Sequence, residues 1–172
     1  STHKVSSFIL MWMAEVSIRT TGSSKDNPIF LLISKELGAS TSIFKKGMGS
    51  MAEFRSINPQ EIFDNPFKLF GSDWGLVTAG TQEGFNTMTI SWGGLGLMWT
   101  KPVAITFIRP SRYTYEFLEQ GDMFTICFFD EQYREALRIC GTKSGRDLDK
   151  LETSGLSSLE CDGVPVVAEA DT

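Results

Sequence analysis

The residues from 109 to 117, RPSRYTYEF, combine the side-chain types that bind an anion. An apolar, β-branched run ends at Arg109, a proline turn follows, and a helix is predicted to begin directly afterwards. The guanidinium groups of Arg109 and Arg112, the hydroxyls of Ser111 and Thr114 and the amides of a helix start would then converge. Such groups bind phosphate through charge-assisted hydrogen bonds. A capped surface helix with solvated arginines has the same composition, so this motif alone leaves both interpretations open.

The segment from 86 to 96, NTMTISWGGLG, predicts a strand followed by a glycine-rich corner. Three glycines within four residues let the backbone approach a flat ligand closely, because they carry no side chain. A strand that simply ends in a tight turn would look the same. The sequence GGLG is not the GxGxxG fingerprint, so the segment does not support a Rossmann-type nicotinamide site.

A third cluster, GTKSGRDLDK at 141 to 150, places cationic and hydroxylic residues in a loop and a helix start. Asp147 and Asp149 are available to neutralise any cation that is not used for binding. Charged helix starts are usually solvated, and exposed ion pairs contribute little. This cluster therefore indicates a ligand site only in combination with the other two clusters.

The composition excludes several classes of chemistry. The chain has 172 residues, 41% of them hydrophobic, which is enough to bury a core, and its formal net charge of -5 argues against general nucleic-acid binding. His3 is the only histidine, which argues against a histidine-based triad or a multi-histidine metal site. We expect Cys127, Cys140 and Cys161 to be buried thiols, and an odd cysteine count favours a reducing compartment, the cytoplasm. No apolar run is long enough to span a membrane.

The elements that must position these clusters are mostly strands. Residues 74 to 79 and 85 to 92 predict a hairpin, while the runs 102 to 108 and 123 to 129 are rich in β-branched and aromatic residues. Short helices are predicted at 113 to 120, ending at Gly121, and at 131 to 140, ending at Gly141. A helical turn or two is expected between Met51 and Phe70. The predicted class is mainly β with short helices.

The three clusters, in this order and with these separations, identify a family resemblance. Residues 51 to 172 resemble the flavin reductase-like family, whose members have an FMN-binding split β-barrel, and the lead-in DNPFKLFGSDWGLVTAG also matches. The resemblance implies a flavin ring lined by Asn86, Thr87, Met88 and Thr89. It implies a ribityl phosphate surrounded by Arg109, Ser111, Arg112, Tyr113 and Thr114. The residues that would close the pocket are Ser144, Gly145, Arg146 and Lys150.

The resemblance also implies a function. The expected activity is electron transfer from NADH or NADPH through FMN, rather than FAD, to free flavin, a protein or another acceptor, in a homodimer. The expected alternative is a flavin-binding electron carrier or sensor that does not react with nicotinamide. Flavin would carry the redox chemistry, so no catalytic side chain is assigned.

The first fifty residues match nothing in the family. They carry six Lys or Arg against three Asp or Glu, whereas residues 51 to 172 carry ten against eighteen, which indicates two segments of different origin. Family domains usually continue beyond the point that corresponds to Asp171, with strands that complete the barrel. Residues 1 to 50 are therefore interpreted as a tag, a tail, or strands that complete the barrel in permuted order.

Overall fold

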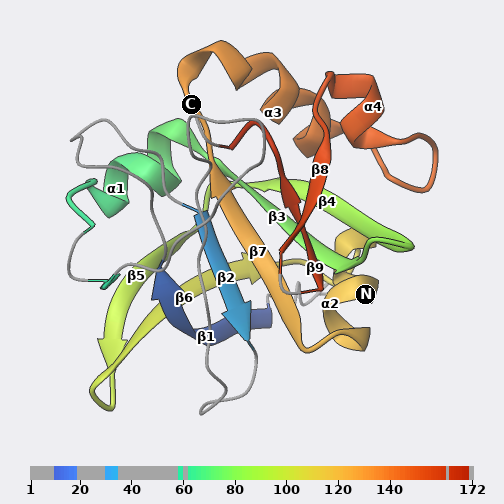
Figure 1. Ribbon diagram of the computed structural model, residues 1–172. Coiled ribbons are helices and arrows are strands. Elements are labelled where there is room, and N and C mark those ends of the chain that lie inside the picture. The colour runs from blue at the N-terminus through green and yellow to red at the C-terminus, as the bar shows by residue number, and fades with distance from the viewer. Residues whose placement is uncertain (1–9, 19–29, 35–57, 60–61, 162, 171–172) are drawn as a thin grey trace, which may run out of the picture.

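The computed structural model describes residues 10–18, 30–34, 58–59, 62–161 and 163–170. Its main feature is a seven-stranded antiparallel sheet with the strand order β4-β3-β7-β2-β1-β6-β5 (Figure 1). The strands are β1 (Leu10–Ile18), β2 (Phe30–Ser34), β3 (Gly75–Thr81), β4 (Gly84–Ile90), β5 (Gly93–Met98), β6 (Lys101–Ile108) and β7 (Met123–Phe128). A separate two-stranded ladder joins β8 (Ser158–Cys161) to β9 (Val164–Val167). The predicted mainly β class is confirmed.

The helices are short, as predicted. They are α1 (Pro66–Lys68), which continues into a π-helical turn at Leu69–Asp73, then α2 (Tyr113–Gln120), α3 (Arg134–Thr142) and α4 (Lys150–Ser154). The prediction for α2 is confirmed, including its end at Gly121. The predicted end of the next helix at Gly141 is wrong, because α3 continues through Gly141, where the missing side chain leaves room for Thr89 of β4. None of the helices in the described part of the chain is long and apolar enough to cross a membrane.

The predicted hairpin between β3 and β4 is confirmed, with Thr78 facing Thr87 across the ladder. Gly80 has a φ of 119°, and a Cβ at this position would lie 2.7 Å from the Cα of Phe85. Only glycine meets both conditions, because L-residues with a side chain avoid this backbone conformation. The glycine at position 80 therefore fixes how the hairpin turns.

The glycine-rich segment after β4 is not a corner. Gly93 to Gly96 belong to the edge strand β5, where pairing with β6 satisfies their backbone groups. A Cβ on Gly93 would lie 2.5 Å from the ring of Phe70, so the glycine lets that aromatic ring pack against the strand. The prediction of a corner at 93 to 96 is corrected: long-range packing, which local sequence does not reveal, makes this segment a strand.

The core lies on β7 and the strands beside it. Phe124 and Ile126 of β7 are fully buried, and β9 packs over β3 and β7. The hydroxyl of Thr125 donates to the carbonyl oxygen of Pro165 at 3.0 Å and joins the small ladder to the sheet. The prediction of three buried thiols is confirmed, and burial raises the pKa of Cys127 to about 12.

Two strands from the first fifty residues lie inside the sheet. β1 pairs with β6 and with β2, while β2 pairs with β7, all antiparallel (Figure 1). The remaining residues of 1–50 lie outside the described ranges. The division of the chain into an extension at 1 to 50 and a domain at 51 to 172 stays a prediction.

Candidate functional site

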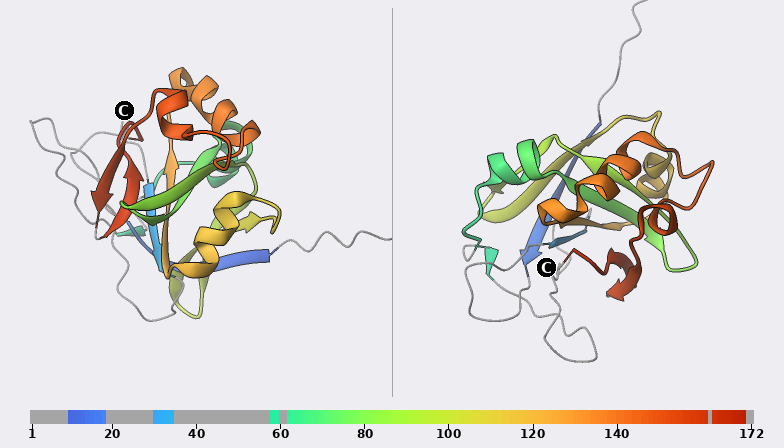
Figure 2. Two further views of the ribbon diagram at one scale, coloured as in Figure 1. Left: turned by 90° about the vertical axis from the view of Figure 1, so that its right-hand side faces the viewer. Right: turned by 90° about the horizontal axis from the view of Figure 1, so that it is seen from above.

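The edge strand β4 is held between α2 and α3. The side-chain amide of Asn86 donates to the hydroxyl of Thr114 on α2 at 2.7 Å, whereas the hydroxyl of Thr89 donates to the carbonyl oxygen of Leu137 on α3. Residues 86 and 89 point to opposite faces of a strand, since side chains alternate. The two helices therefore flank β4, as Figure 2 shows in its left view. Arg112 at the start of α2 donates to the carbonyl oxygen of Gly141 near the end of α3, so these two helix ends lie close together.

A first hollow, which we call the arginine hollow, lies at the end of β4. Its volume is about 100 Å³, and it is lined by Met88, Thr89, Ile90, Ser91, Trp92, Phe107, Arg109 and Arg112. Arg112 is the N-cap of α2, and no side chain caps that helix start. Four of the sequence-predicted site residues meet here: Met88, Thr89, Arg109 and Arg112.

The two arginines of this hollow have no carboxylate partner within 4.0 Å among the described residues. The other three arginines in those ranges, Arg134, Arg138 and Arg146, each pair with a glutamate. The guanidinium of Arg112 donates to a neutral acceptor, the carbonyl oxygen of Gly141, at 3.4 Å. The arginine hollow thus concentrates positive charge that the surrounding described residues do not neutralise, and an anionic group would be favoured there.

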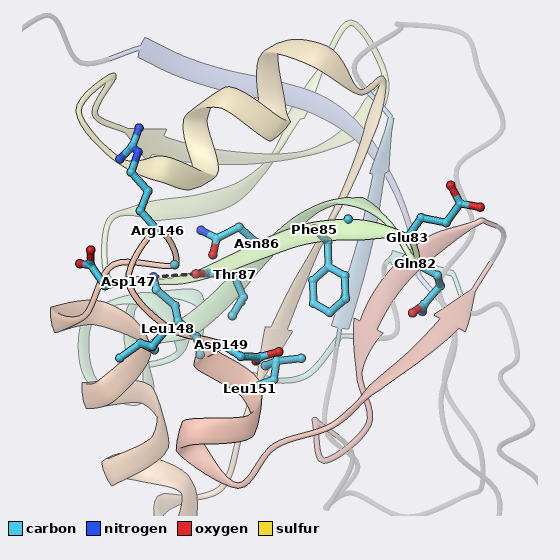
Figure 3. Close-up of a pocket in the computed structure, with 13 residues that line it drawn as sticks. Gln82, Glu83, Phe85, Asn86, Thr87, Arg146, Asp147, Leu148, Asp149 and Leu151 are labelled. Atoms are coloured by element: carbon cyan, nitrogen blue, oxygen red, sulfur yellow. Dashed lines mark hydrogen bonds between the residues drawn. The ribbon is translucent and has the colours of Figure 1, made fainter.

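A second and larger hollow, the loop hollow, lies at the start of β4. Its volume is about 550 Å³ (Figure 3), and its lining consists of residues 82 to 87 and residues 145 to 151. The other predicted residues that line a hollow meet here: Asn86, Thr87, Gly145, Arg146 and Lys150. The predicted residues therefore divide between two hollows on one strand, rather than surrounding a single pocket.

Lys150 is the most buried cation of the site, with 7% of its surface exposed. Its ammonium donates to the carbonyl oxygens of Thr87 at 2.8 Å and of Cys140 at 2.9 Å. Burial lowers the pKa of Lys150, because it disfavours the charged form, and the nearby positive charge of Arg112 lowers this pKa further. The carbonyl oxygens supply part of the compensation, since both Cys140 and Gly141 lie in the last turn of α3, the negative end of a helix dipole.

The loop between α3 and α4 lies close against α2. A Cβ on Gly145 would be 2.8 Å from Cγ of Asn86 and closer still to its Oδ1, so only glycine lets the loop lie here. Arg146 pairs with Glu116, and its guanidinium stacks over the ring of Tyr113 at 4.5 Å. In Figure 3 the Arg146 side chain extends toward α2 and away from the loop hollow. The charge of Arg146 is thus already compensated within the protein.

The remaining predicted residues line neither hollow; they are Ser111, Tyr113, Thr114 and Ser144. Thr114 is buried and accepts from Asn86, which orients that amide. The hydroxyl of Ser144 accepts from the backbone N–H of Arg146 at 3.2 Å and shapes the loop. These two residues support the lining rather than form it.

Sequence reasoning missed two aromatic residues of the arginine hollow. Trp92 is 57% exposed and Phe107 is 36% exposed, although aromatic residues are usually buried. The signal for Phe107 was its position two residues before Arg109, because alternate residues of an extended chain share a face. Trp92 lies within the cluster at 86 to 96, but no site role was assigned to it there.

Comparison with known proteins agrees with the mainly β fold of the domain. Residues 67–171 match the family model of the flavin reductase like domain, so the chain belongs to this family. An FMN-binding domain of a flavin reductases-like enzyme from Shewanella baltica OS155 superposes with a TM-score of 0.51 at 25% identity, covering 60% of this chain and 56% of that one. Flavoredoxin of Desulfovibrio vulgaris (Miyazaki F) superposes with a TM-score of 0.50 at 25% identity, covering 56% of this chain and 54% of that one.

The chain therefore spans little more than half the length of these two structures. Among curated proteins, none matches it significantly. The family membership and the structural likeness confirm the resemblance on which the sequence interpretation depended.

Proposed function

We propose that the protein binds FMN and transfers electrons from NADH or NADPH through the flavin to an acceptor. The observation that carries this proposal is the arginine hollow, where Arg109 and Arg112 face a cavity without a carboxylate partner among the described residues. Family membership supports it, as does the likeness to a domain described as FMN-binding.

The two hollows suit different parts of such a ligand. The arginine hollow, at about 100 Å³, has room for a phosphate group but not for a whole mononucleotide. The loop hollow, at about 550 Å³, lies within the range of roughly 300 to 1,000 Å³ that is typical of small-molecule sites. Both open along β4. We therefore assign phosphate binding to Arg109 and Arg112, contact with the larger remainder of the ligand to Asn86 and Thr87 in the loop hollow, and contact beside the phosphate to Met88 and Thr89.

The side chains of this site bind and orient rather than react. Arg109 and Arg112 hold negative charge, Thr114 fixes the amide of Asn86, and Trp92 and Phe107 offer apolar surface beside the cations. When bound, FMN supplies the redox chemistry by accepting a hydride and passing electrons on. None of these residues is assigned a proton-transfer role.

The Arg112→Ala variant tests the phosphate assignment. Its FMN dissociation constant should rise at least tenfold, because a charge-assisted hydrogen bond contributes about 1.5 to 3 kcal/mol and 1.4 kcal/mol corresponds to a factor of ten. Arg138→Ala is the matched control, since Arg138 is exposed on α3 and paired with Glu135. An Arg112→Ala protein that binds FMN as tightly as the control would contradict the assignment.

A second candidate function is a flavin-binding electron carrier that does not react with nicotinamide. The likeness to a flavoredoxin favours it. Steady-state oxidation of NADH and NADPH with FMN present separates the two functions. Turnover above the rate of free FMN supports the reductase, and flavin binding without turnover supports the carrier.

We also propose that the protein forms a homodimer. Leu97 of β5 and Trp99 in the turn after it are 73% and 76% exposed, and β5 is an edge strand of the main sheet. Exposed apolar residues beside the free edge of a strand favour association with another chain. Light scattering should give twice the mass of one chain, and a Leu97→Asp variant should shift that mass toward the monomer.

A further inference from the structure

Lys150 connects three elements of the site at one atom. It is the first residue of α4, and its Nζ donates to Thr87 on β4 at 2.8 Å and to Cys140 on α3 at 2.9 Å. Thr87 O belongs to an edge strand, so this carbonyl has no neighbouring strand to bond with on that side. The ammonium of Lys150 therefore takes the place of a strand partner for β4.

The last turn of α3 accepts hydrogen bonds from two site residues, Lys150 and Arg112. In that turn Cys140 O accepts from Lys150 and Gly141 O accepts from Arg112, while Leu137 O, one turn earlier in α3, accepts from Thr89. The carbonyl groups at a helix C-terminus lack intrahelical partners, and cations are favoured beside them. The position of Arg112 in the arginine hollow and the position of β4 thus depend on the same helical turn.

Burying the ammonium of Lys150 is unfavourable by itself, so its hydrogen bonds must offset that cost. Lys150 has no carboxylate within 4.0 Å among the described residues, and Arg112 is a like charge close by. A buried ammonium without a counter-ion costs several kcal/mol in general. A methionine would fill similar volume without that cost, but it would leave the carbonyl oxygens of Thr87 and Cys140 without a donor.

We propose that Lys150 is a positioning residue of the flavin site, acting through β4 and through the last turn of α3 rather than by contact with the phosphate. This inference rests on the proposed function. It differs from the sequence-based expectation, which placed Lys150 directly around the ligand. Two observations support positioning over phosphate contact: the ammonium of Lys150 donates to two backbone carbonyl groups, and Lys150 lines the loop hollow, not the arginine hollow.

The test compares FMN with riboflavin, which lacks the phosphate, in Lys150→Met and in Arg112→Ala. Because Lys150 positions the strand that contacts the ligand, Lys150→Met should raise the dissociation constants of both flavins by a similar factor, about tenfold for the lost charge-assisted hydrogen bonds. Arg112→Ala should weaken FMN alone. Lys68→Met, on exposed α1 and outside both hollows, is the matched lysine control.

Hydrogen exchange of the ligand-free proteins separates positioning from direct contact. Lys150→Met should speed exchange in β4 and at the end of α3 before any flavin is added, and Lys150→Arg should restore part of the protection. Unchanged exchange with weaker binding would mean that Lys150 touches the ligand, and weaker FMN but unchanged riboflavin binding would mean that it is a phosphate ligand. Either result overturns the proposal, as does unchanged binding of both flavins.

A Lys150→Met chain that does not fold still leaves a test in the wild-type protein. The phosphorus NMR shift of bound FMN should stay constant through the alkaline titration of Lys150, and a shift that follows this titration would overturn the proposal. Wild-type protein that binds neither flavin would refute the proposed function instead.

Discussion

Replacing Gly145 by alanine should loosen the contact between the α3–α4 loop and β4. A Cβ at this position would lie 2.8 Å from Cγ of Asn86 and 3.2 Å from the ring of Tyr113, whereas ordinary contacts begin at 3.4 Å. The loop or the Asn86 amide must therefore move, and Asn86 cannot move without disturbing its 2.7 Å hydrogen bond to Thr114, which is buried.

The magnitude follows from that hydrogen bond. Leaving a buried donor or acceptor unsatisfied costs about 1 to 3 kcal/mol, so Gly145→Ala should lower the free energy of unfolding by about this amount. The assay is urea denaturation, and Gly71→Ala is the control, because no heavy atom lies within 4 Å of a Cβ at Gly71. The same variant should also bind FMN more weakly, since Asn86 and the loop line the larger hollow.

A double-mutant cycle makes this prediction specific to Asn86. In an Asn86→Ala background the added methyl group has space, so Gly145→Ala should cost much less there than in the wild type. Equal costs in both backgrounds, or a Gly145→Ala protein as stable as Gly71→Ala, would refute the reasoning.

Three further predictions concern charges and thiols. Burial lowers the pKa of Lys150 in the folded protein, so the charged form of this side chain reduces the free energy of unfolding at neutral pH. This loss should diminish as the pH rises toward the ordinary value of 10.5, because the folded state releases the proton before the unfolded state does. The free energy of unfolding of Lys150→Met relative to wild type, measured at rising pH, checks the sign. Cys127, with a pKa of about 12 and full burial, should resist a thiol reagent until the protein unfolds, and labelling of the native protein would contradict this. Arg146→Ala should raise the FMN dissociation constant less than Arg112→Ala does, because Glu116 already neutralises Arg146; an equal effect would show that Arg146 reaches the ligand.

Local patterns predicted most of the secondary structure. The helix at 113 to 120 and the strand at 123 to 128 were visible because turn residues and β-branched runs mark them directly. The β8–β9 hairpin was not predicted, although its strands flank a turn at Gly163 with a φ of 78°. Strand β5 was also missed, since its four-residue start is mostly glycine and becomes a strand only through β6.

The site was predicted in composition but not in arrangement. The sequence clusters identified the cations and hydroxyls of the site. They do not reveal that one face of β4 packs against α2 and the other against α3, which separates these residues into two hollows. The pairing of Arg146 with Glu116, thirty positions apart, depends on the tertiary fold. The burial of Lys150 likewise depends on contacts with β4 and α3, which no local motif encodes.

Equilibrium titration of the wild-type chain with FMN, followed by flavin fluorescence, is the sharpest test of the proposed phosphate recognition by Arg109 and Arg112. We expect saturable quenching, weaker binding of riboflavin, and loss of that preference for FMN in Arg112→Ala, because Arg109 and Arg112, which have no carboxylate partner among the described residues, would recognise the phosphate. Absence of quenching, or equal binding of FMN and riboflavin by the wild-type protein, would contradict it.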